Sequence, residues 1–110
     1  MLNLNTQSRN AVEQIDYHRT AEHALQFALM LVPSWLPVGQ RRGDEWVALN
    51  PTRPDRTLGS FSVNLRTGRW ADFSTGDGGG DLISLRAYLD GSTQRQAALA
   101  LLRELGGSIR

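Results

Sequence analysis

The sequence predicts an α+β fold, in which a small antiparallel β-sheet is flanked by one helix before it and by two C-terminal helices after it. Polar and apolar residues alternate over 60–65, which is the period of a strand with one buried face. Apolar residues also recur at helical spacing on both sides of that segment. The chain has 110 residues, enough for one domain. We expect residues 1–18 to form a flexible lead-in and residues 19–110 to form a single domain.

The N-terminal half contains signals for one helix and one short strand. Thr20 has the side chain of a helix N-cap, and apolar residues follow it at helical spacing. Pro33 lacks an amide hydrogen, so the helix is expected to end before it. The sequence therefore predicts a helix over 20–32, a polar turn over 39–44 and a strand over 45–49.

The sequence at the centre of the chain predicts a β-hairpin, with the strand over 60–65, a turn over 66–68 and a return strand over 69–73. A type I turn with Gly68 in the left-handed conformation gives a bulged hairpin. Leu65 then opposes Arg69, Asn64 opposes Trp70, Val63 opposes Ala71, and Phe61 opposes Phe73. This register places Trp70 on the outer face and puts Ala71 and Phe73 on the core face, whereas a two-residue loop would bury Trp70 beside Leu65.

The C-terminal part of the sequence predicts a glycine-rich loop over 74–80, followed by two helices. Asp81 is expected to cap the first helix, which runs to about Leu89. Ser92 or Thr93 is expected to cap the second helix, and Thr93 and Gln96 have the spacing of a capping box. Glycines at 106 and 107 are expected to end that helix.

Composition excludes several classes of function. The absence of cysteine excludes disulfides and thiolate-bound metals, and the absence of lysine excludes a P-loop nucleotidase. All 12 basic residues are arginine and the net charge is +1. Arginine suits phosphate and base recognition, although the codons of a GC-rich genome explain the same bias and are the favoured explanation. Without a membrane-length apolar run or a signal-like N-terminus, we expect a cytoplasmic protein with no membrane partner.

Five short segments carry a resemblance to a known family. They lie at 50–53, 59–63, 68–70, 72–76 and 79–83. Their order and spacing resemble the zinc-binding (zinc-ribbon) domain of bacterial, phage and plasmid DNA primases and primase-helicases. The resemblance implies a zinc-ribbon-like hairpin that engages template DNA during replication and is not catalytic by itself, either excised from a longer chain or encoded alone by a mobile element.

The sequence departs from that family at the metal ligands. The family usually has Cys-Pro-x-His and Cys-x-x-Cys, and the corresponding positions here are Asn50, Arg53, Asp72 and Thr75. Structural zinc needs thiolate, imidazole or carboxylate ligands, and arginine repels a cation. We therefore expect no metal and no cofactor, but an Arg53–Asp72 salt bridge with Asn50 and Thr75 hydrogen-bonded nearby. The alternative is that all four are solvated loop residues.

Trp70 and four arginines are the candidate nucleic-acid-binding residues. An aromatic ring on a sheet face can stack on unpaired bases, and neighbouring arginines can contact phosphates. Arg66 and Arg69 flank the hairpin turn, and Arg53 and Arg56 occupy the preceding loop. The alternative for Trp70 is that it packs beneath a loop or helix.

Two functions follow from these observations. The first is a metal-free, single-stranded-DNA-binding module of a primase or primase-helicase. The second is a stand-alone phage or mobile-element interaction protein, whose partner is a replication or defence protein. We favour the first and keep the second as the alternative, for which the low net charge and the lost ligands argue. We expect no enzyme, because there is no cysteine and no histidine has a serine and an acid at motif spacing.

Overall fold

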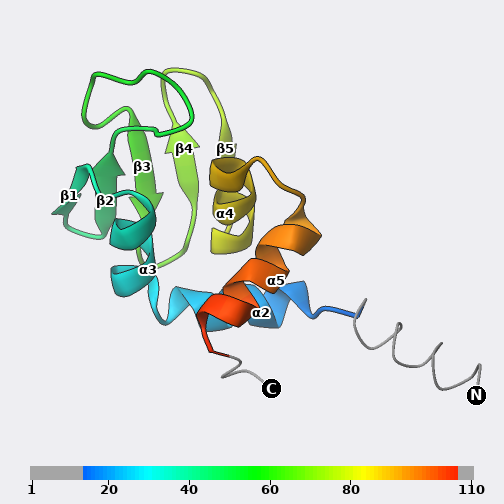
Figure 1. Ribbon diagram of the computed structural model, residues 1–110. Helices are drawn as coiled ribbons and strands as arrows, with labels where there is room; N and C mark the ends of the chain where they lie inside the picture. The colour runs from blue at the N-terminus through cyan, green and yellow to red at the C-terminus, as the bar shows by residue number, and fades with distance from the viewer. Residues whose placement is uncertain (1–13, 107–110) are drawn as a thin grey trace, which may run out of the picture.

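A computed structural model of the chain describes residues 14–106 and confirms the predicted α+β fold (Figure 1). The order of helix, sheet and two C-terminal helices is the predicted one. In chain order the elements are α2 (Tyr17–Leu25), α3 (Ala28–Trp35), β1 (Gly39–Arg42), β2 (Glu45–Ala48), β3 (Phe61–Asn64), β4 (Trp70–Asp72), β5 (Gly78–Gly79), α4 (Leu82–Asp90) and α5 (Gln94–Glu104).

The five strands form one antiparallel sheet in the order β1-β2-β3-β4-β5. The two edge strands correct the sequence analysis, which placed a polar turn over 39–44 and a loop over 74–80. Strand β1 turns back onto β2 at Gly43, whose φ is +62°. Most residues of β1 are exposed, so it lacks the apolar alternation that reveals a half-buried strand. Strand β5 consists of glycines, and only its pairing with β4 defines it.

The predicted single helix over 20–32 is instead two helices, α2 and α3, separated at Gln26 and Phe27. Asp16 caps α2 by accepting a bond from the Arg19 amide, so Thr20 is a buried helical residue rather than the cap. Pro33 lies inside α3 rather than beyond its end. Residues 1–13 of the predicted lead-in lie outside the described residues, whereas 17 and 18 belong to α2.

The β3–β4 hairpin differs from the predicted register by one residue. Phe61 lies opposite Asp72, and Val63 lies opposite Trp70. The cause is the loop, which spans 65–68 and is closed by the bond from the Asn64 amide to the Arg69 carbonyl at 2.7 Å. The Asn64 side chain caps this loop, because its Oδ1 accepts from the amides at 66 and 67, both at 2.9 Å.

The register decides which return-strand side chains are buried, since a slip of one residue turns every side chain to the other face. Trp70 is only 6% exposed, so the prediction that it faces outward is wrong. Ala71 is partly exposed and Phe73 is 73% exposed, so their predicted place in the core is also wrong. The indole of Trp70 lies 4.7 Å from the Tyr88 ring, centroid to centroid, and its Nε1 donates to Ser84 Oγ at 2.9 Å.

The C-terminal helices begin where the sequence predicted. Asp81 caps α4 in a capping box with Ser84, and Thr93 caps α5 in a box with Gln96. Gly91 ends α4 in the left-handed conformation, with φ of +64°. The caps satisfy amides that the first helical turn leaves without partners. No helix among residues 14–106 is long and apolar enough to cross a membrane.

The core lies between one face of the sheet and the helices, and within residues 14–106 no helix covers the other sheet face (Figure 1). On the covered face, Trp46 Nε1 donates to the Leu36 carbonyl beyond α3, and Trp70 contacts Tyr88 of α4. The largest fully buried apolar side chains come from both layers: Phe61, Leu36, Leu82, Ile83, Leu85, Leu101, Val32 and Val63. The uncovered face therefore presents strand side chains directly to solvent.

Candidate nucleic-acid interface

Asp72 is the centre of a buried polar cluster at the end of β4. Its Oδ2 accepts from Arg53 Nε at 2.8 Å, and its Oδ1 accepts from Arg53 Nη2 at 3.2 Å. The predicted Arg53–Asp72 salt bridge is therefore confirmed, and it has the two-bond geometry that arginine forms with carboxylates. The Asp72 side chain is fully buried, whereas that of Arg53 is 26% exposed.

Asn50 and Thr75 also contact Asp72, in different ways. Asn50 is 1% exposed and its Nδ2 donates to Asp72 Oδ2 at 2.8 Å. Thr75 donates only its backbone amide, at 3.3 Å, beside the Ser74 amide at 2.9 Å. The Thr75 hydroxyl instead accepts from the amide of Asp77. The alternative of four solvated loop residues is thus wrong for Asn50 and Asp72.

Two further residues of this cluster were not predicted. Asp55 Oδ2 accepts from the Asn50 amide at 2.8 Å and from Ser60 Oγ at 3.0 Å. Tyr88 of α4 accepts from Asn50 Nδ2 and donates to Asp77, both at 2.9 Å. The cluster therefore joins the 50–60 loop, the end of the hairpin and α4. Aspartate and tyrosine at these positions carry no motif spacing, so only the folded arrangement reveals them.

The bonds stabilise the charged forms of the cluster. The guanidinium of Arg53 holds the pKa of Asp72 far below its usual value despite burial, and Asn50 and the Ser74 amide act in the same direction. The hydrogen bond to Asp72 in turn raises the pKa of Arg53. The Asn50 amide lowers the pKa of Asp55. At neutral pH the site is an ion pair whose acceptors are occupied.

The cluster does not fit a zinc ion. A metal bound to Asp72 would have to displace Arg53, which occupies both carboxylate oxygens and is itself cationic. The amide of Asn50 that faces Asp72 is a donor rather than a lone pair. Within residues 14–106, no group of three or more His, Asp or Glu side chains is placed to hold a metal.

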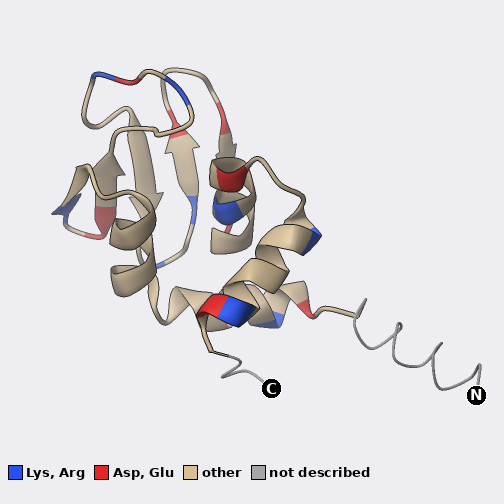
Figure 2. Cartoon of the chain, viewed as in Figure 1, with Lys and Arg blue, Asp and Glu red and all other residues tan. Residues whose placement is uncertain are grey.

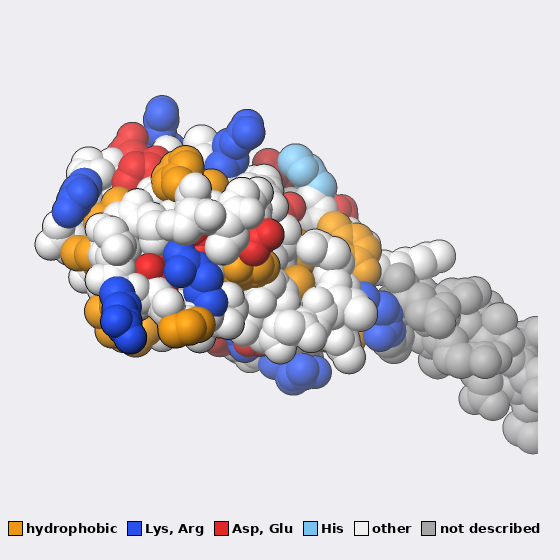
Figure 3. All heavy atoms as spheres, turned by 90° about the horizontal axis from the view of Figure 1, so that it is seen from above, with side chains coloured by type: hydrophobic (Ala, Val, Ile, Leu, Met, Phe, Trp, Pro, Cys, Tyr) orange, Lys and Arg blue, Asp and Glu red, His pale blue; other side chains and the backbone are white. Residues whose placement is uncertain are grey.

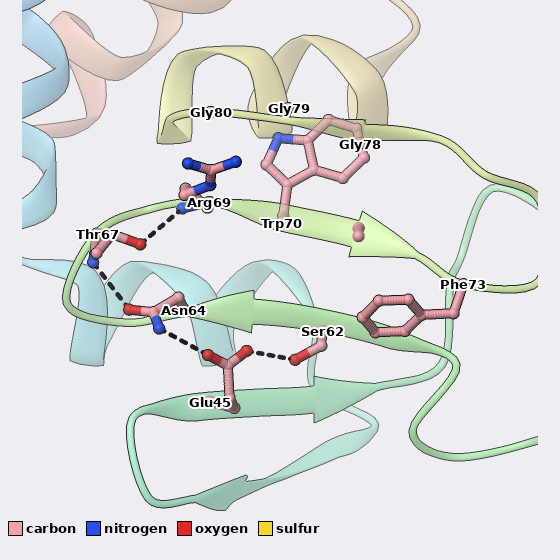
Figure 4. Close-up of a pocket in the computed structure, with 11 residues that line it drawn as sticks. Glu45, Ser62, Asn64, Thr67, Arg69, Trp70, Phe73, Gly78, Gly79 and Gly80 are labelled. Carbon is pink, nitrogen blue, oxygen red and sulfur yellow. Dashed lines mark hydrogen bonds between the residues drawn. The ribbon is translucent and has the colours of Figure 1, made fainter.

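The uncovered sheet face forms an open groove of about 620 Å³ (Figure 4). Phe73 and Arg69 line it from the hairpin, and the backbone of Gly78–Gly79 lines it from β5. Glu45 of β2 forms part of the floor of the groove, with its carboxylate beside Ser62 and Asn64 of β3. One surface therefore carries the exposed aromatic ring of Phe73, the cation of Arg69 and the hydrogen-bonded carboxylate of Glu45.

The four candidate arginines do not form one basic surface. Arg53 is held by Asp72, and Arg66 lies 3.4 Å from Asp44 in an exposed ion pair. Arg56 is exposed in the loop that precedes β3, whereas Arg69 follows the hairpin loop, so the two arginines lie toward opposite ends of that strand. Acidic and basic residues are interspersed over the fold (Figure 2), and basic side chains stand apart from one another at the loop end of the sheet (Figure 3). Of the four, Arg69 alone lines the groove.

Phe73 takes the exposed aromatic position that the sequence analysis assigned to Trp70. Trp70 cannot stack on a base in this conformation, because its ring is covered by Tyr88 and by β5. A Cβ on Gly79 would lie 2.6 Å from Trp70 Nε1, so the indole occupies the space that this glycine leaves open. The sequence signals for this arrangement were Asn64, a good turn-capping residue, and the glycine that faces Trp70.

This chain and part of a bacterial primase have similar folds. A solved structure with a similar fold is the crystal structure of the Aquifex aeolicus primase, described by its zinc binding and RNA polymerase domains. The TM-score is 0.68 and the sequence identity is 23%, and the match covers 83% of this chain but 21% of that one. This chain therefore spans about a fifth of the primase chain that it matches. No protein family and no curated protein matches the sequence.

Proposed function

We propose that this chain is a single-stranded-DNA-binding module of a DNA primase or primase-helicase, which holds template without a metal and is not catalytic by itself. The observation that carries the proposal is Phe73, a 73% exposed aromatic ring that lines an open groove together with Arg69. Two findings support it: the fold shared with part of a bacterial primase, and the order of the five sequence segments that resemble the primase zinc-binding domain.

The groove has the two components that single-strand binding uses. Stacking on an aromatic ring contributes about 1–3 kcal/mol per base, and it tolerates any base because every base has a π-face. Arg69 lines the same groove with an exposed side chain, and it lies at the other end of β4 from Phe73, so it can contact a phosphate of a neighbouring nucleotide. A duplex would hide its bases from Phe73, so the geometry favours single strands.

In this proposal the Asp72 cluster replaces the zinc knuckle of the family. The resemblance assigns Asn50, Arg53, Asp72 and Thr75 to the ligand positions, and all four meet through bonds to Asp72. A metal and this cluster would perform the same mechanical task, which is to tie the loop before β3 to the end of β4. The groove is then supported on one side by a rigid, hydrogen-bonded loop.

Titration of the purified chain with a short labelled oligothymidylate at two salt concentrations tests the proposal. Phe73→Ala should weaken binding by about 1–3 kcal/mol with an unchanged salt slope. Arg69→Ala should reduce the salt slope by about one unit, because one phosphate contact is lost. Phe73→Trp should retain affinity whereas Phe73→Leu should not, which separates stacking from simple burial.

Arg95→Ala is the charge-matched control, since Arg95 is an exposed residue of α5 and lies outside the groove. It should leave the salt slope nearly unchanged. If the unmodified chain shows no affinity at low salt, or if Arg95→Ala and Arg69→Ala behave alike, the groove is not a nucleic-acid site.

A protein-binding role is the second candidate, and a specific surface favours it. Helix α3 contains no charged residue, and Leu29 and Met30 on its outer side are 61% and 59% exposed. Exposed apolar helix faces of this kind are typical of contacts with other proteins. If Leu29→Glu abolished capture of a replication or defence protein while DNA binding was absent, this candidate would replace the first.

A further inference from the structure

Glu45 is the acidic side chain on the floor of the groove. It extends from β2 toward β3, where Oε1 accepts from Ser62 Oγ at 2.5 Å and Oε2 accepts from Asn64 Nδ2 at 2.7 Å (Figure 4). Each carboxylate oxygen can accept about two hydrogen bonds. One acceptor position per oxygen is therefore used by the protein, and the carboxylate keeps capacity toward the groove that it lines.

The charge of Glu45 decides what can lie above it. Among residues 14–106, no arginine lies within ion-pair distance of Glu45, since its two bonds come from a hydroxyl and an amide. A phosphate above this carboxylate would be repelled. A DNA strand bound in the groove would therefore run with its phosphates along Arg69 and with a base over Glu45.

Resting on the single-strand role proposed above, we infer that Glu45 selects guanine at the base that stacks on Phe73. A carboxylate can only accept hydrogen bonds, so it favours a base edge made of donors. Guanine presents the N1 hydrogen and the N2 amino group side by side. Adenine and cytosine present one amino group beside a ring acceptor, and thymine presents one N–H between two carbonyl oxygens that the carboxylate repels.

Neighbouring groups hold the carboxylate in the orientation that this recognition needs. Ser62 and Asn64 fix its two oxygens from the same strand, and Asn64 is itself fixed because its Oδ1 caps the hairpin loop. A preorganised acceptor loses little entropy when a base binds. Phe73 lines the same groove, so one nucleotide can contact both side chains.

The test uses the full chain and labelled oligothymidylates in which one central thymine is replaced by guanine, hypoxanthine or adenine. Guanine should bind about five-fold or more tighter than thymine, as expected for a two-bond base contact. Hypoxanthine keeps the N1 hydrogen but lacks the N2 amino group, so it should lose most of this gain. These comparisons use the unmodified protein and do not depend on the folding of any variant.

Glu45→Gln should bring the guanine and thymine probes to within about two-fold of each other, because the amide turns one acceptor into a donor. Asp44→Asn, the adjacent carboxylate outside the groove, should keep the preference. Equal affinity for all probes, or a guanine preference that survives in a folded Glu45→Gln variant, would overturn the inference and leave the proposed function intact. Loss of binding to every probe by the unmodified chain would instead overturn the proposed function.

Discussion

The Arg53 guanidinium and the Asp72 carboxylate lie 2.8 Å apart and join the loop before β3 to the end of β4. Asp72 is fully buried and receives further bonds from Asn50 and from two backbone amides. A buried carboxylate is tolerated only when its acceptors are occupied. The pair therefore acts as a cross-link whose loss leaves several donors without a partner.

Asp72→Asn should destabilise the fold by about 2–3 kcal/mol, because hydrogen bonds to a charged acceptor become weaker and one oxygen becomes a donor facing Arg53. Chemical denaturation followed by tryptophan fluorescence measures the change. Asp44→Asn removes the carboxylate of the exposed pair with Arg66 and should change stability by no more than about 0.5 kcal/mol. Equal effects of the two substitutions would show that burial of Asp72 does not matter.

Stability should fall in acid. The folded-state pKa values of Asp72 and Asp55 are lowered, so the stability that they contribute is fully present above the unfolded pKa of 3.8. It is lost as the pH falls through 3.8 toward the folded pKa, because the unfolded chain then binds protons that the folded chain does not. Unfolding midpoints measured between about pH 6 and pH 2 should show this decline, and a shallower one for Asp72→Asn. An identical pH profile for that variant would contradict the role of Asp72.

Gly79→Ala should be destabilising, whereas Gly80→Ala should have little effect. A Cβ at Gly79 would lie 2.6 Å from Trp70 Nε1 and would also meet Ser84 Oγ, but a Cβ at Gly80 meets nothing within 4 Å. Overpacking of this kind typically costs about 1–3 kcal/mol. Thermal melting of the two neighbouring variants gives the comparison, and similar melting temperatures would contradict the packing of Trp70 against β5.

Trp70→Ala should destabilise the chain by about 3–5 kcal/mol, because it leaves a cavity between Phe61 and Tyr88. Phe73→Ala removes an exposed ring and should change stability by less than about 1 kcal/mol. Denaturant unfolding of both variants distinguishes the two aromatic residues. A larger loss at Phe73 than at Trp70 would restore the bulged register that the sequence analysis favoured.

Addition of a metal chelator should leave the unfolding midpoint unchanged, and elemental analysis of the purified chain should find no stoichiometric zinc. The reason is that Arg53 occupies the position next to Asp72 where a cation would bind. A chelator-induced drop in melting temperature, or one zinc per chain, would contradict this expectation.

The fold could be predicted from the sequence where local signals and tertiary structure agree. The caps at Asp81 and Thr93 are read directly from residue type and spacing. The exposed strand β1 and the glycine strand β5 could not be predicted, because neither has an alternation of apolar and polar residues. The predicted hairpin register was wrong for a different reason. Gly68 fits a bulged turn, but the side chain of Asn64 stabilises the longer loop.

The candidate site was predicted in the same uneven way. The Arg53–Asp72 contact followed from a resemblance that placed two opposite charges at neighbouring ligand positions, and its prediction made no use of the hairpin register. The identity of the exposed aromatic ring was predicted from the register alone, so the error of one residue exchanged Trp70 for Phe73. Tyr88 and Asp55 enter the cluster through long-range packing that no spacing rule contains.

The loop over 65–68 therefore restricts how this hairpin can diverge. A slip of the β3–β4 pairing by a single residue would turn Trp70 and Asp72 toward solvent and Ala71 and Phe73 toward the core, which would remove the cross-link and the exposed ring in one event. A slip of two residues would preserve the alternation. Homologues that keep this groove should accordingly keep a loop that holds Val63 opposite Trp70, whatever the number of residues in that loop.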